Sequence, residues 1–116
     1  MTVLLDHSTL NELREALGEE LDGIVQLYVD GLVEQARALQ GLLAAQDLAT
    51  LRRQAHSLKG SSVSMGAQAL GQAAAQIEKL AASGSESPEL RDGVAGIVSL
   101  ASDTERALRD SGWARP

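Results

Sequence analysis

No proline occurs before Pro88 in this chain, and the only other proline is the last residue, Pro116. Proline interrupts helices because it lacks a backbone N–H and its ring clashes with the preceding turn. Through this proline-free stretch, apolar residues recur at steps of three and four positions, the spacing that places side chains on one face of an α-helix. The chain is therefore constrained to fold into long amphipathic helices.

The apolar residues are mostly small and aliphatic. They make up 44% of the sequence, yet the chain has no phenylalanine, one tyrosine and one tryptophan. Leucine and alanine favour helices, whereas aromatic and β-branched residues are enriched in strands. With 116 residues, the chain has the size of one ordinary domain. We therefore predict a single all-α domain over residues 1–116.

Turn and cap residues divide the pattern into five helices. Thr9 and Glu12 have the spacing of a capping box that opens the first helix, and Asp47 and Ser87 are suited to cap the third and the fifth. The predicted helices span residues 9–17, 20–45, 48–65, 67–82 and 88–110. Short connections make successive long helices antiparallel. The predicted fold is an antiparallel four-helix bundle with a short additional N-terminal helix.

Each long helix carries one stripe that is predicted to be buried. The stripe residues are Leu21, Ile24, Val25, Tyr28, Leu32, Leu39, Leu42 and Leu43, then Leu48, Leu51, Ala55, Leu58, Ser62 and Met65, then Leu70, Ala74, Ile77 and Ala81, and finally Leu90, Val94, Ile97, Val98, Ala101 and Leu108. Residues on the opposite helix faces are expected in solvent.

Charge and composition exclude several classes of function. The formal net charge of −6 disfavours binding to nucleic acid or to anionic membranes. The chain has no cysteine, which excludes thiolate nucleophiles and zinc–thiolate sites. No apolar run is long enough to span a bilayer, and the first residues lack the pattern of a signal peptide. We expect a cytoplasmic monomer that binds neither nucleic acid nor membranes.

The helix predicted over residues 48–65 carries a polar face with an unusual composition. The residues on that face, at steps of three and four, are Arg52, His56, Lys59, Gly60 and Val63, and Arg53 borders it. An acidic protein thus gathers three cations around one imidazole, an arrangement that suits an anion. Gly60 costs the helix about 1 kcal/mol relative to alanine but leaves the imidazole approachable.

Glu78 is expected to lie at the height of His56. Counting from the turn at Gly66, His56 lies ten residues back and Glu78 twelve residues forward along an antiparallel hairpin. A carboxylate that accepts a hydrogen bond from one imidazole nitrogen orients the ring and leaves the other nitrogen free to attack. The same carboxylate could instead form a surface ion pair with Arg52. The only other histidine, His7, has no paired ligand pattern, so no metal site is expected.

Residues 55–67, AHSLKGSSVSMGA, resemble the signature of histidine-containing phosphotransfer (HPt) domains. In that family a histidine stands in x-H-x-L-K-G, and a Gly-Ala pair opens the next helix. The matching residues here are His56, Leu58, Lys59, Gly60, Gly66 and Ala67. The resemblance implies that Nε2 of His56 is phosphorylated, that Lys59 supports the phosphoryl group and that Gly60 makes room for a partner. It also implies that Glu78, where the family has Gln or Glu, bonds to the other imidazole nitrogen.

By the same resemblance, the chain is a phosphocarrier and not an enzyme. HPt domains exchange a phosphoryl group with an aspartate of a receiver domain, in a multistep phosphorelay that begins at a hybrid sensor kinase. The sequence shows no acidic cluster placed to hold Mg²⁺, so the receiver is expected to supply it. We expect Arg52, Arg53 and Val63 to contact the partner. The bundle occupies almost the full sequence, which favours a stand-alone bacterial protein; the alternative is a domain excised from a larger hybrid kinase.

The alternative is a non-transferring adaptor of the same shape that binds a receiver or a sensor kinase. Such an adaptor could present Tyr28, Leu32 and Val63 to its partner, although apolar residues at helical spacing are usually core. An adaptor has no need of His56, Lys59 and Gly60 together, and this combination distinguishes the two hypotheses.

Overall fold

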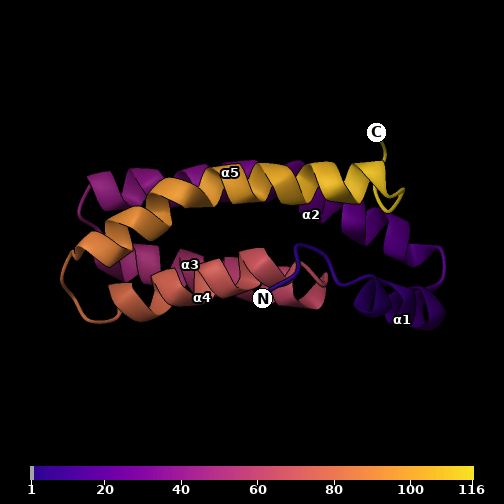
Figure 1. Cartoon of the computed structure of the whole chain (residues 1–116), viewed down its shortest axis with the longest axis horizontal. Coiled ribbons are helices and arrows are strands. Elements are labelled where there is room, and N and C mark those ends of the chain that lie inside the picture. The colour runs from indigo at the N-terminus through magenta and orange to yellow at the C-terminus, as the bar shows by residue number, and fades with distance from the viewer. Residues whose placement is uncertain (1) are drawn as a thin grey trace.

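The computed structural model describes residues 2–116, and these contain five α-helices. Their bounds are His7–Leu17 for α1, Glu20–Ala44 for α2, Leu48–Ser64 for α3, Gln68–Ala81 for α4 and Pro88–Asp110 for α5. Each long helix packs on two others, α2 on α3 and α5, and α4 on α3 and α5. The long helices run antiparallel to their neighbours in sequence, and α1 projects beyond one end of the α3–α4 hairpin (Figure 1). This confirms the predicted four-helix bundle with a short leading helix.

One apolar core lies between the four long helices. Its largest fully buried side chains are Leu10, Leu21, Leu32, Leu39, Leu51, Leu58, Leu70, Ile77, Leu90, Ile97, Leu108 and Val25. The hydroxyl groups of Tyr28 and Ser62 lie 2.7 Å apart within it, so each satisfies the other. Burial raises the pKa of Tyr28 to about 12. Tyr28 and Leu32 are both buried, which removes them from any partner surface.

One residue of the predicted core stripe of α2 lies outside the core. Ile24 is 42% exposed, and its neighbour Leu27 is 77% exposed. Leu21, Val25 and Tyr28 occupy the core-facing positions of this part of the helix. Ile24 lies at the edge of that stripe because a straight helix has only a limited arc that faces its neighbours.

The N-terminal cap of α1 is Asp6, and the prediction of a capping box at Thr9 is wrong. The backbone N–H of Ser8 donates to the carboxylate of Asp6 over 3.0 Å, and Thr9 lies inside the helix. Hydrogen bonds from Ser8 lower the pKa of Asp6. The predicted caps Asp47 and Ser87 are confirmed, since they accept from the backbone N–H groups of Thr50 and Leu90.

The segment before α1 is bound to the turn between α3 and α4. Asp6 N donates to Gly66 O over 2.7 Å, and Ala69 N donates to Val3 O over 3.0 Å. Gly66 has a φ of +75°, and a Cβ at this position would lie 2.7 Å from Asp6 O. Glycine is required here both for the left-handed backbone and for the close approach of the two segments. This tertiary contact holds Asp6 where it caps α1.

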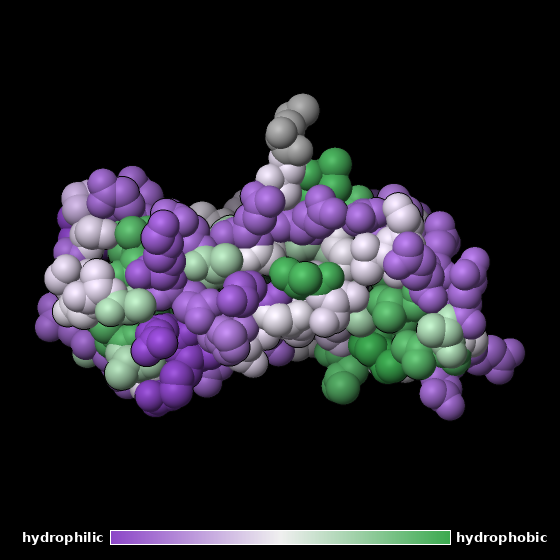
Figure 2. All heavy atoms as spheres, turned by 90° about the horizontal axis from the view of Figure 1, so that it is seen from below, coloured by the Kyte–Doolittle hydropathy of each residue, from purple (hydrophilic) through white to green (hydrophobic). Residues whose placement is uncertain are grey.

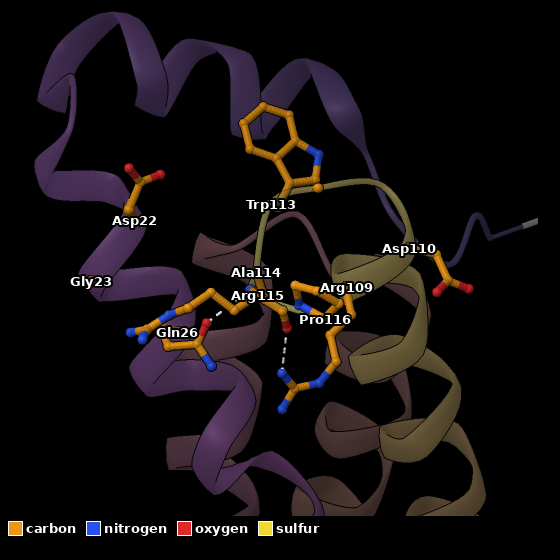
Figure 3. Close-up of a pocket in the computed structure, with 10 residues that line it drawn as sticks. Asp22, Gly23, Gln26, Arg109, Asp110, Trp113, Ala114, Arg115 and Pro116 are labelled. Atoms are coloured by element: carbon orange, nitrogen blue, oxygen red, sulfur yellow. Dashed lines mark hydrogen bonds between the residues drawn. The ribbon is translucent and has the colours of Figure 1, made fainter.

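The segment after α5 turns back against α2 and α1 (Figure 3). Arg115 N donates to Gln26 Oε1 over 2.9 Å, and the guanidinium of Arg109 donates to the backbone oxygen of Arg115. Trp113 Nε1 donates to His7 Nδ1 over 3.1 Å, and the two rings stack. The C-terminal segment is therefore held against the start of α1 and against α2.

No helix within residues 2–116 combines the length and the apolar character needed to cross a membrane.

Candidate functional site

His56 lies in the middle of α3 with its side chain 65% exposed. Ala55 and Leu58 are buried on the other side of the helix and fix which way α3 faces. His56 Nδ1 lies 2.8 Å from Glu78 Oε2. An ionised carboxylate only accepts hydrogen bonds, so this contact places the imidazole proton on Nδ1. Nε2, on the other side of the ring, is left with its lone pair as the nucleophilic atom.

Glu78 comes from α4 and uses both of its carboxylate oxygens. While Oε2 contacts His56, Oε1 lies 3.0 Å from Lys59 Nζ. The hydrogen bond from Lys59 is the largest cause that lowers the pKa of Glu78, and His56 adds to it. The structure thus brings Glu78 to His56, as the hairpin count predicts, and pairs it with Lys59 instead of Arg52. The contact between Lys59 and Glu78 is not predicted by the sequence spacing.

Two arginines extend the positive charge of this face towards the start of α3. Arg52 and Arg53 are exposed, and together with His56 and Glu78 they line a shallow hollow of about 460 Å³. Seen from the side of α3 and α4, the most hydrophilic residues cluster in the half away from α1, and a large hydrophobic patch lies near α1 (Figure 2). The hollow combines an exposed imidazole with cations, which suits a small anionic group.

The surface on the other side of His56 is open and more apolar. A Cβ added at Gly60 would meet nothing within 4 Å, and Val63 is 59% exposed. Val63 packs closely on α4, where a Cβ at Gly71 would lie 3.0 Å from its Cγ2 atom. A second hollow, of about 330 Å³, lies beside Lys59 and Val63. Gly71 was not singled out from the sequence, although a glycine inside a helix is a signal of close packing.

Two hydroxyl groups near His56, those of Ser61 and Ser64, are not arranged as nucleophiles. Ser61 Oγ donates to Leu58 O, and Ser64 Oγ donates to Gly60 O, so each bonds to the backbone of its own helix. Within residues 2–116, no three His, Asp or Glu side chains are grouped so that they could hold a metal ion. The group suited to covalent chemistry on this face is therefore the oriented imidazole of His56.

The hollow at the C-terminal segment, of about 660 Å³, differs in character from the one at His56. Its side chains come from α2, the end of α5 and residues 112–116 (Figure 3). The guanidinium of Arg109 is already engaged there with Asp30, Glu105 and the backbone of Arg115. The charge of Arg109 therefore serves contacts within the chain.

Comparison with known protein families finds a match over most of the chain. A family model described as Hpt domain matches residues 23–110, which run from the first turn of α2 to the end of α5. His56, Lys59, Gly60 and Glu78 all lie inside the matched range, whereas α1 and both end segments lie outside it. No curated protein and no solved structure matches the chain.

Proposed function

This chain belongs to the HPt domain family, and on that premise we propose that Nε2 of His56 accepts a phosphoryl group from an aspartate of one receiver domain and passes it to an aspartate of another. HPt domains act in phosphorelays as phosphocarriers and not as kinases. Their partners are the receiver and kinase proteins of the relay.

The contact between His56 and Glu78 is the observation that carries this proposal. It keeps the imidazole proton on Nδ1, 2.8 Å from the carboxylate, and so presents the Nε2 lone pair on an exposed ring. A fixed orientation is the main help that a protein can give to phosphoryl transfer, because the loose transition state needs positioning and charge stabilisation.

The transfer step needs no covalent participant from this chain besides His56. The Nε2 lone pair attacks the phosphorus of the aspartyl phosphate, and the bond between phosphorus and the carboxylate oxygen breaks with its electron pair on that oxygen. Lys59, Arg52 and Arg53 supply positive charge for the equatorial oxygens. The Mg²⁺ that such transfers need would be held by the acidic residues of the receiver.

Partner contacts are proposed on both sides of the imidazole. The exposed Arg52 and Arg53 would meet the acidic pocket of a receiver, and this charge complementarity would speed the encounter. Val63, 59% exposed, would provide an apolar contact. Gly60 would let the partner reach the ring, because no side chain stands beside it.

The proposal is tested by incubating the protein with a phosphorylated receiver domain and Mg²⁺, followed by intact mass measurement. We expect one added phosphoryl group that is labile in acid and stable in base, and we expect His56→Gln to abolish it. The chain has two histidines, so His7→Gln is the matched control and should still be phosphorylated. Receivers that bind the protein but transfer nothing would refute the proposal and favour the adaptor.

A further inference from the structure

The carboxylate of Glu78 accepts hydrogen bonds from two side chains, and one of them, Lys59, is the residue expected to support the phosphoryl group. Oε1 lies 3.0 Å from Lys59 Nζ, and Oε2 lies 2.8 Å from His56 Nδ1. Glu78 is 20% exposed and Lys59 34%, so both are partly shielded from water. Lys59 therefore begins in an ion pair with Glu78, and it must leave this carboxylate to reach an incoming phosphoryl group.

We propose that Lys59 changes partner when His56 is phosphorylated, leaving Glu78 Oε1 for the phosphoryl oxygens, while Glu78 stays with the imidazole. This inference rests on the proposed phosphorylation of Nε2. It assigns Glu78 a second role besides orientation of the ring, because its carboxylate holds the ammonium group of Lys59 until the phosphoryl group arrives.

The charges at the site change in a way that favours this exchange. When Nε2 bonds to phosphorus, the proton on Nδ1 remains and the ring becomes a phosphoimidazolium cation that faces Glu78 Oε2. The phosphoryl group brings about two negative charges and three acceptor oxygens. Glu78 thus gains a full cation at His56, while a stronger anion forms within reach of Lys59. When the phosphoryl group leaves, the P–N electron pair returns to Nε2 and Lys59 can return to Glu78.

The geometry of the helix makes the movement short. His56 and Lys59 are three residues apart on α3, the spacing at which side chains on one helix face are neighbours. Lysine carries a compact charge on a flexible four-carbon stem, so it can move between two anions without a change in the backbone. The open surface at Gly60 leaves room for the phosphoryl group beside the ring.

The substitution Glu78→Gln separates the two roles of the carboxylate. The amide oxygen can still accept from His56 Nδ1, but the amide NH₂ group cannot accept from the ammonium of Lys59. We therefore expect Lys59 to be released in the unphosphorylated variant. Once His56 is phosphorylated, Lys59 should lie on the phosphoryl group in both proteins.

The test is NMR of the lysine ammonium groups before and after phosphorylation with phosphoramidate, a small chemical donor that needs no receiver. The chain has two lysines, so the exposed Lys79 is an internal reference for Lys59. We expect Glu78→Gln to shift the Lys59 signal in the unphosphorylated protein, and Glu86→Gln, an exposed charge-matched control, to leave it in place. Phosphorylation should shift the wild-type Lys59 signal to the position seen in phosphorylated Glu78→Gln.

The outcomes separate this inference from the proposed function. If intact mass shows a phosphoryl group on His56 and the wild-type Lys59 signal does not move, Lys59 stays on Glu78 and the inference is overturned alone. If His56 accepts no phosphoryl group from any donor, the proposed function fails and the inference fails with it. The wild-type spectra decide the question even if Glu78→Gln is not phosphorylated.

Discussion

Replacing Gly60 by alanine should stabilise the protein and impair its transfer at the same time. Gly60 lies inside α3, is exposed, and has a backbone conformation that other residues adopt. A Cβ at this position would meet nothing within 4 Å, so alanine creates no clash within the chain. Since alanine is favoured over glycine in a helix interior, we expect Gly60→Ala to raise the free energy of unfolding by about 0.8–1 kcal/mol.

That stabilisation is measurable by thermal unfolding. For a chain of 116 residues, about 1 kcal/mol corresponds to a rise in Tm of about 4 °C. In the complex with a receiver, the new methyl group stands on the surface that the partner must approach. A steric cost of about 1.4 kcal/mol there slows transfer from a phosphorylated receiver about tenfold. Phosphorylation by phosphoramidate should keep its wild-type rate because that donor is small.

Gly96→Ala in α5 is the matched control. Gly96 is also exposed inside a helix, and a Cβ there would also meet nothing within 4 Å. We expect the same rise in Tm with unchanged transfer from the receiver. If Gly60→Ala transferred at the wild-type rate, the role of Gly60 in partner access would be refuted. A lower Tm for Gly60→Ala would show that the space around Gly60 is not open.

Three further predictions concern the core and the α3–α4 turn. Tyr28→Phe should lower the free energy of unfolding by about 1 kcal/mol in urea titration, because Ser62 loses its buried partner, and an unchanged midpoint would contradict this. Burial raises the pKa of Tyr28 to about 12 from 10.0, so the unfolded chain loses this proton at a lower pH than the folded protein. The free energy of unfolding should therefore fall by about 2 kcal/mol as the pH rises from 10 to 12, a loss that Tyr28→Phe should not show. Gly66→Ala should lower the free energy of unfolding by about 2–4 kcal/mol in urea titration, since it combines a positive φ with a contact of 2.7 Å between the new Cβ and Asp6 O. Gly84→Ala, at a site with a positive φ but open space, should lower it by only about 1 kcal/mol. Equal losses in the two variants would exclude the contact as the cause.

The helices and their caps were largely predictable because they depend on residues close together in sequence. Asp47 and Ser87 cap α3 and α5 through backbone N–H groups three residues further on. The stripe of Leu51, Ala55 and Leu58 is buried, and this places His56 on the outer face of α3. The cap of α1 was not predictable in this way, because Asp6 is held in place by Gly66, far along the chain.

The partners of Glu78 show the limit of such reasoning at the site. Counting residues along the hairpin predicts that Glu78 lies at the same height as His56. The rise per residue fixes only this position along the helix axis, and it does not determine how α4 is rotated about that axis. That rotation decides whether one carboxylate faces His56, Lys59 or Arg52, and packing of Ile77 and Ala74 into the core sets it. The same dependence on packing explains why Ile24 is exposed although its spacing fits the stripe.

The sequence by itself thus determined the five helices, the outward face of His56 and the family to which the chain belongs, since each follows from local spacing or a local motif. Only the tertiary structure decided that the Glu78 carboxylate lies 2.8 Å from His56 Nδ1 and 3.0 Å from Lys59 Nζ. It also decided that Gly66 O accepts a hydrogen bond from the backbone N–H of Asp6, in the segment before α1. Hydrogen bonds and ion pairs between helices require donor and acceptor atoms to be placed to within a few tenths of an ångström. Only the packing of complete side chains positions two helices that accurately.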